Sequence, residues 1–151
     1  MMSHFLKYAA CASLALTCAA VFGAPATAQA VDDSIYLELN SAAPIETGGC
    51  RLTFVISNTT ETGLSQISYQ LGIFDSNQIV QNLLIMSFGE MQAGRTKIVL
   101  FDISNRECAD ISRLLINAVE TCTDAGSGDA SAVCEQNLAT RAIPTNIQLG
   151  I

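Results

Sequence analysis

Carboxylates are the most abundant side chains in this sequence that could carry out chemistry. Fourteen Asp and Glu residues accompany seven Lys and Arg residues and a single histidine, His4. Asp75 and Asp102 each follow a phenylalanine at the end of a predicted strand, so the two could meet at one edge of the fold. Paired carboxylates can act as general acid and base, as glycan hydrolysis requires. Asp at a strand end more often caps a turn, and we favour that interpretation for both residues.

A second set of oxygen-bearing side chains lies in a polar, glycine-rich segment and could offer ligands to calcium. The set is Asp124, Ser127, Asp129 and Ser131, with Glu135 nearby. Calcium loops normally have a denser alternation of acids and end in a bidentate glutamate, which this spacing does not match. We therefore predict a solvated loop, with no metal and no cofactor.

Four of the few basic residues flank two predicted turns. They are Arg95 and Lys97 at the first turn, and Arg106 and Arg113 at the second. If both turns lie at the same end of the fold, these residues form a positive patch that could dock an anionic partner. The alternative, which we favour, is surface ion pairing with the neighbouring Glu107 and Asp110.

The N-terminal segment has the anatomy of a secretory signal peptide. Lys7 precedes an uncharged apolar run at 8–23, and small residues then lead to a cleavage position after Ala30. We predict that residues 1–30 are removed and that the protein is periplasmic or secreted in a bacterium, without stable membrane insertion. Because His4 leaves with this segment, Ser-His-Asp and Cys-His catalysis and the commonest zinc sites are excluded.

Four cysteines remain after Ala30. They are Cys50, Cys108, Cys122 and Cys134. An even number in an oxidising compartment predicts two disulfides, and three pairings are possible. We favour Cys50 with Cys108 and Cys122 with Cys134, because the second bridge would close the glycine-rich loop. Redox and metal-thiolate chemistry are disfavoured, since no two cysteines have Cys-x-x-Cys spacing.

The charge and composition of residues 31–151 exclude further classes of protein. With six basic and fourteen acidic residues the segment has a net charge of −8. A nucleic-acid binder or a membrane-surface helix would need a broad basic surface instead. The apolar fraction of this segment, about 45 per cent, is typical of one globular domain.

Apolar residues recur at every second position over much of the chain, which predicts β-strands. The alternation is clean at 34–40, 50–57 and 67–73. Denser apolar runs at 79–86, 97–103 and 114–120 predict central strands or strands covered on both faces. Within 114–120 we expect the amide of Asn117 to make a structural hydrogen bond.

Two helical segments and a last strand complete the predicted elements. Ser104 and Glu107 have capping-box spacing and predict a helical turn that carries Cys108. A helix is predicted at about 130–141, with Asp129 as its N-cap, followed by a final strand near 147–149. Six or seven strands in about 120 residues predict one domain, residues 31–151, folded as an all-β antiparallel β-sandwich with a short C-terminal helix; a small barrel is the alternative.

Several short motifs resemble a group of small secreted proteobacterial proteins to which no activity is assigned. The motifs are Gly49-Cys-Arg-Leu-Thr-Phe-Val55 with Asn58, Phe74-Asp75, Phe88-Gly89, Ala93-Gly-Arg95, Phe101-Asp102, Cys108, Leu115-Ile-Asn117 and Cys122. More loosely, Tyr69 to Phe101 looks like the immunoglobulin-like modules of bacterial envelope proteins. The second resemblance implies an immunoglobulin-like sandwich and carries no activity with it.

We therefore expect an exported, non-catalytic protein that binds an unidentified envelope protein or stabilises an assembly, through sheet edges and loops. The alternatives are a carboxylate-dependent enzyme that acts on glycans, and a carrier of calcium or a small ligand.

Overall fold

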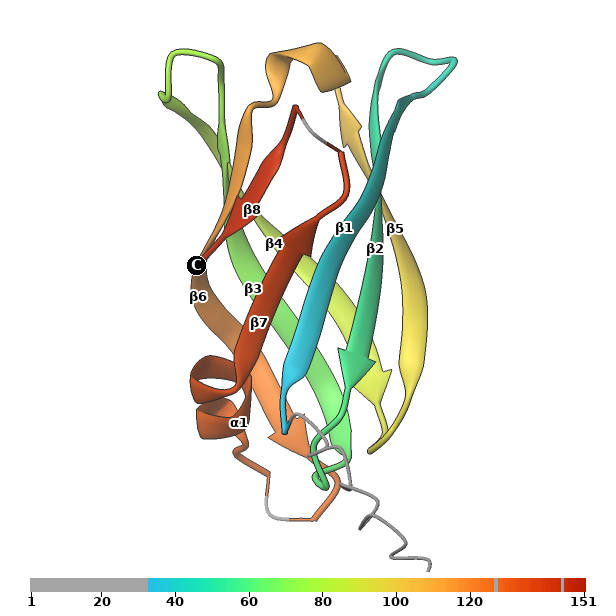
Figure 1. The fold of residues 1–151 in the computed structure, drawn as a ribbon, viewed down its shortest axis with the longest axis vertical. Helices are drawn as coiled ribbons and strands as arrows, with labels where there is room; N and C mark the ends of the chain where they lie inside the picture. Colours follow the sequence, from blue (N-terminus) through green and yellow to red (C-terminus); the bar gives the residue numbers. More distant parts are fainter. Residues whose placement is uncertain (1–32, 127, 145) are drawn as a thin grey trace, which may run out of the picture.

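The structure is a computed structural model that describes residues 33–126, 128–144 and 146–151. The predicted signal peptide and Ser127 lie outside the described residues. The described chain forms strands and two short helical elements (Figure 1). The strands are β1 (Ile35–Pro44), β2 (Gly49–Asn58), β3 (Leu64–Phe74), β4 (Val80–Met91), β5 (Thr96–Ser104), β6 (Arg113–Asp124), β7 (Leu138–Ala142) and β8 (Gln148–Gly150). The helical elements are η1 (Cys108–Asp110), a 3-10 turn, and α1 (Ser131–Gln136).

The strands form two four-stranded sheets, in the orders β5-β2-β1-β7 and β4-β3-β6-β8. This confirms the predicted all-β sandwich with a short helix near the C-terminus, and the predicted final strand is β8. The prediction of a wholly antiparallel arrangement is wrong at two positions, because β7 runs parallel to β1 and β8 runs parallel to β6. Both exceptions arise because the chain after β6 adds one strand to the outer edge of each sheet (Figure 1).

The core lies between the sheets and is built by the alternation that the sequence displays. Leu37, Leu52 and Phe54 of the first sheet and Tyr69 and Leu71 of the second have no exposed surface. Buried aromatic rings join the layers: the Phe54 and Phe88 ring centres lie 5.8 Å apart with their planes at 89°. Edge-to-face contacts of this kind add to the apolar burial that drives the sheets together.

Tyr69 also brings a polar group into the core. Its hydroxyl donates a hydrogen bond to the carbonyl oxygen of Cys134, 3.2 Å away. Burial disfavours the phenolate and so raises the pKa of Tyr69 well above its ordinary value. The side chain therefore acts as a neutral donor that fastens α1 to the sandwich.

The prediction that 79–86 and 97–103 form central or doubly covered strands is wrong. They lie in β4 and β5, which are edge strands of the two sheets. Their dense apolar content does not reflect burial on two faces, because the outward-facing residues of both strands are exposed. The third dense run, 114–120, lies in β6, which is central between β3 and β8 as predicted.

The predicted helix at 130–141 is too long. The helix α1 ends at Gln136, and the following residues form β7, where Ile35 donates a backbone hydrogen bond to the carbonyl oxygen of Asn137 at 2.9 Å. Pairing with the open edge of β1 outweighs the helical preference of Leu, Ala and Arg in this segment, because it satisfies backbone groups of both strands and intrinsic propensity is easily overridden by tertiary context. Ala130 occupies the N-cap position rather than Asp129.

The helical turn at Cys108 is confirmed as η1, although the predicted capping box is not formed. Glu107 is its N-cap residue and makes no side-chain capping hydrogen bond. Both expected disulfides are present: Cys50–Cys108 joins β2 to η1, and Cys122–Cys134 joins β6 to α1. Within the described residues, no helix has the length and apolar content needed to cross a membrane.

Candidate functional site

Asp75, the first candidate catalytic carboxylate, caps the turn between β3 and β4. Its Oδ1 accepts hydrogen bonds from the backbone N–H groups of Asn77 at 2.9 Å and Ile79 at 3.0 Å. Its Oδ2 accepts a third from Nε2 of Gln81 at 2.8 Å. The favoured structural interpretation is confirmed, because the carboxylate satisfies backbone donors that the turn leaves unpaired.

Asp102, the second candidate, lies on β5 in the other sheet and binds Arg51 of β2. Nε and Nη2 of Arg51 donate to the two carboxylate oxygens, each at 2.7 Å. The hydrogen bonds from Arg51 favour the charged carboxylate and lower the pKa of Asp102. Rather than capping a turn, Asp102 forms a bidentate cross-strand pair, so it does not share a proton with Asp75.

The acids of the glycine-rich loop accept hydrogen bonds from nearby backbone N–H groups, as Asp75 does. Oδ1 of Asp124 accepts the backbone N–H groups of Gly126 at 2.8 Å and Gly128 at 3.0 Å. Oδ1 of Asp129 accepts the N–H and hydroxyl of Ser131, and the hydroxyl bond foremost lowers the pKa of Asp129. Among the described residues, no group of three or more His, Cys, Asp or Glu side chains is placed to hold a metal ion.

The predicted basic patch does not form, because its two halves lie at opposite ends of the sandwich. Arg95 and Lys97 are at the β4–β5 turn, before or at the start of β5, whereas Arg106 and Arg113 come after its end. A nine-residue strand separates them by roughly 30 Å at the usual rise per residue. The two turns therefore cannot join into one docking point.

The favoured surface pairing with Glu107 and Asp110 is also not observed. In the described part of the chain, the two ion pairs join Arg51 to Asp102 and Arg141 to Glu38. The guanidinium of Arg113 instead lies over the ring of Phe74, 4.0 Å from its centre. This contact covers an aromatic ring on the outer face of the second sheet.

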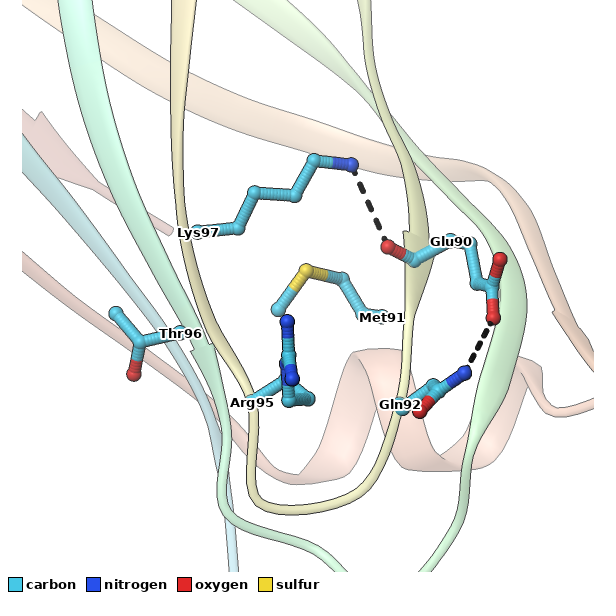
Figure 2. A pocket seen from close by; sticks show the side chains of 6 residues that line it. All are labelled: Glu90, Met91, Gln92, Arg95, Thr96 and Lys97. Atoms are coloured by element: carbon cyan, nitrogen blue, oxygen red, sulfur yellow. Dashed lines mark hydrogen bonds between the residues drawn. The ribbon is translucent and has the colours of Figure 1, made fainter.

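Lys97 has a specific role at the edge of the sandwich (Figure 2). Its Nζ extends from β5 to β4 and donates to the carbonyl oxygen of Phe88 at 2.7 Å. A longer contact of 3.4 Å to the carbonyl oxygen of Glu90 is drawn in Figure 2. A side chain at Gly89, whose φ is +71°, would place its Cβ 3.3 Å from this ammonium group. The lysine thus occupies the unpaired edge of β4 at Phe88 to Glu90, near the C-terminal end of that strand.

A polar hollow of about 360 Å³ surrounds Lys97 at this end of the molecule. It is lined by Glu90, Met91, Gln92, Arg95, Thr96 and Lys97 (Figure 2). Oε1 of Glu90 is bound by Nε2 of Gln92 at 2.9 Å, and no acid of the described residues forms an ion pair with Arg95. The hollow is therefore lined by two cationic side chains and one carboxylate, and that carboxylate is bound to the amide of Gln92 rather than to Arg95.

Six large apolar side chains on or directly before the edge strands β4 and β5 are exposed, which the sequence patterns did not reveal. We call this set of residues the open side; each is more than half exposed, and the set is Ile79, Val80, Leu83, Ile85, Ile98 and Leu100. Only two other large apolar residues of the described chain, Ile143 and Ile151, are exposed to a similar degree. The signal was present in the dense apolar runs, which were interpreted as burial.

Asn117 makes the predicted structural hydrogen bond on the outer face of the second sheet. Its Nδ2 donates to Oε1 of Gln70 on the neighbouring β3 at 2.6 Å, and the contact is exposed to solvent. The partner is a side chain rather than the backbone near the disulfide. The pair joins two strands and offers no reactive group.

Fold and site together define a disulfide-bonded β-sandwich with exposed apolar side chains on the edge strands β4 and β5. No protein-family model matches the chain, and no curated protein matches it in sequence. Its structure is similar to that of IrmA from Escherichia coli, with a TM-score of 0.54 over 71% of this chain and 90% of that one, at 13% identity. At this identity the similarity shows a shared fold with a small bacterial protein and nothing more.

Proposed function

We propose that this protein is an exported, non-catalytic β-sandwich that binds another protein of the bacterial cell envelope through its open side. The observation that carries the proposal is that Ile79, Val80, Leu83, Ile85, Ile98 and Leu100 are all more than half exposed and lie on or directly before the two edge strands β4 and β5, in a molecule whose core is already filled. Sheet edges that carry exposed apolar side chains are surfaces on which other chains can pair.

The state of the polar groups supports a binding function over a catalytic one. Asp75 and Asp102, the carboxylates considered for glycan hydrolysis, are engaged by a turn and by Arg51. The acids of the glycine-rich loop serve its own backbone. The pKa values of Asp102 and Asp129 are lowered by their hydrogen-bond donors, whereas a general acid needs a raised pKa.

An envelope location agrees with the covalent structure. Two disulfides are stable in the periplasm or outside the cell and are rare in the cytosol. The predicted signal peptide gives the route of export. We therefore propose a periplasmic or secreted location, where the protein binds a protein partner.

The proposal is tested by affinity capture from envelope extracts with wild-type protein and the variant Leu83→Ser/Ile98→Ser/Leu100→Ser. We expect the variant to lose, by tenfold or more, a partner that the wild type captures. Ile143→Ser is the matched control, because it removes an exposed isoleucine outside the open side. Equal capture by all three proteins would contradict the proposal.

A further inference from the structure

We propose that the edge of β5 binds an extended segment of the partner as an added strand, held by main-chain hydrogen bonds. The segment has apolar residues at alternate positions and an acidic residue at the end that lies beside Arg95. This inference rests on the proposed function and names the chemistry of the partner. It follows from a comparison of the four free sheet edges, the geometry of one peptide group and the charges at the β4–β5 turn.

Three of the four edges are poorly suited to an added strand. The edge strands β7 and β8 contain five and three residues. The edge strand β4 is long, but its register with β3 shifts at three places, and Lys97 already occupies the carbonyl oxygens of Phe88 and Glu90. Short strands, bulges and an inward-pointing lysine are the devices by which proteins protect sheet edges from pairing.

The edge of β5 lacks most of these protections. All nine of its residues pair with β2 in one unbroken register, from Gly49 opposite Ser104 to Ser57 opposite Thr96. It contains no proline or glycine, and β2 is its neighbour on one side only. A long, regular and apolar edge is the kind that accepts a strand from another chain.

The backbone direction at this edge is fixed by a single hydrogen bond. Asn58 donates its N–H to the carbonyl oxygen of Arg95 at 2.9 Å, so this carbonyl points toward β2. The N–H of Thr96 belongs to the same peptide group and therefore points away from β2. Alternation along the strand then directs the N–H and C=O groups of Ile98 and Leu100 outward as well.

The same two residues present their side chains on the exposed face of the sheet. Ile98 is 64% exposed and lies opposite Val55, and Leu100 is 55% exposed and lies opposite Thr53. A strand added at this edge would place its own alternate side chains next to them, and cross-strand apolar pairs stabilise such sheets. This arrangement selects a segment with apolar residues at every second position.

Charge selects the end of the segment and disfavours a second copy of this chain. Arg95, just before β5, forms no ion pair among the described residues, whereas the Nζ of Lys97 is held by the carbonyl oxygens of Phe88 and Glu90. In an antiparallel pair of β5 strands the Arg95 end would lie beside Asp102 of the other copy, which Arg51 already binds. A foreign segment that ends in a free Asp or Glu offers Arg95 a carboxylate that has no other partner.

The location is tested by photo-crosslinking in the full chain, expressed in the bacterium that produces it. p-Benzoylphenylalanine replaces Ile98, and control proteins carry it at Ser87 of β4 or Gln148 of β8. We expect at least tenfold more adduct from position 98. The crosslinked segment, sequenced by mass spectrometry, should contain alternating apolar residues with Asp or Glu at one end.

The main-chain pairing is tested in the same crosslinking protein by two substitutions at Leu100. Leu100→Pro removes an outward N–H without removing a hydrogen bond to β2, and it should lower the adduct yield about tenfold. Leu100→Thr keeps the N–H and introduces a β-branched side chain that suits a strand, and the yield should fall no more than about threefold. Equal losses in the two variants would overturn main-chain pairing. Far-ultraviolet circular dichroism verifies that both variants fold.

The role of charge is tested by Arg95→Glu, which should lower the yield about threefold. An unchanged yield would overturn the acidic end of the segment.

The outcomes separate this inference from the proposed function. Adduct formed chiefly from Ser87 or Gln148 overturns the β5 site and leaves a protein-binding function in place. Adduct at position 98 that proves to be a dimer of this chain overturns the foreign segment. If none of the three positions forms an adduct with any protein, and capture by the open side also fails, the proposed function itself is wrong.

Discussion

At the scale of single residues, most polar side chains that invited a chemical interpretation are engaged in holding local structure. Asp75 and Asp129 each accept hydrogen bonds from backbone N–H groups two residues further along the chain. Asp102 and Arg51 form a bidentate cross-strand contact in the first sheet, with two hydrogen bonds of 2.7 Å. The spacing of these residues identified them as candidates, but their partners are set by turns and by strand register.

The Arg51–Asp102 pair has a titration behaviour that can be measured. Because Arg51 stabilises the carboxylate, the folded-state pKa of Asp102 lies below its unfolded value of about 3.9. The pair therefore contributes stability at pH values above that unfolded pKa, and the contribution is lost as the pH falls through the folded pKa. We expect an NMR titration of the Asp102 carboxyl carbon to give a pKa below the ordinary range.

Substituting the partner should reverse this shift. In Arg51→Gln the pKa of Asp102 should rise toward the value of an exposed aspartate. Arg141→Gln, which removes the other ion pair of the same sheet, is the matched control and should leave it unchanged. The same pKa in wild type and Arg51→Gln would show that the arginine is not the cause.

At the scale of elements, sequence patterns predicted the strands well and their places in the sheets poorly. The alternation at 34–40, 50–57 and 67–73 reports which face of a strand is buried, and β1, β2 and β3 follow it. Whether a strand is central or at an edge depends on which strands lie beside it, which no local pattern contains. Apolar residues in β4 and β5 therefore predicted burial, although their outer faces are open.

The C-terminal segment and the cysteines show which features a local sequence pattern can predict and which it cannot. Residues 138–142 have spacing compatible with a helix, but the vacant edge of β1 draws them into β7. The pairing of Cys122 with Cys134 could be anticipated, because a short polar loop between them needs a closing bond. The open side could not be predicted from the sequence, because its exposure depends on β4 and β5 being edge strands.

Lys97 is predicted to protect the β4 edge from unwanted pairing. Lys97→Met keeps the length of the side chain but removes the donor to the carbonyl oxygens of Phe88 and Glu90. We expect a loss of about 1 kcal/mol in the free energy of unfolding, because a charged hydrogen bond is removed at a partly exposed site. The freed edge should also raise the rate of aggregation, measured by light scattering at 37 °C.

The matched control is Arg95→Met, which removes a positive charge from the same turn without removing the contact to β4. It should aggregate at nearly the wild-type rate. Comparable aggregation of the two variants would attribute the effect to net charge and would contradict a specific role for Lys97.

At the scale of the whole molecule, apolar surface serves two separate purposes. One set of residues, which includes Leu52, Phe54 and Tyr69, is buried between the sheets and supplies the free energy of folding. The other set forms the open side, where Ile98 and Leu100 are more than half exposed in the folded chain. Because more than half of each of these side chains stays in water on folding, the second set contributes less to stability than the core does, and its presence on an acidic domain with two disulfides needs another explanation.

This division predicts that substitutions in the two sets change the free energy of unfolding by very different amounts. Ile98→Lys/Leu100→Lys should change the free energy of unfolding, measured in urea, by no more than about 0.5 kcal/mol per site. Leu52→Ala on the neighbouring β2 should cost about 2–5 kcal/mol, because it leaves a cavity in the core. The lysine variant should also elute much earlier from a hydrophobic-interaction column. If the lysine variant unfolded as readily as Leu52→Ala, the open side would be part of the folding core, and its role as a surface kept for a partner would be lost.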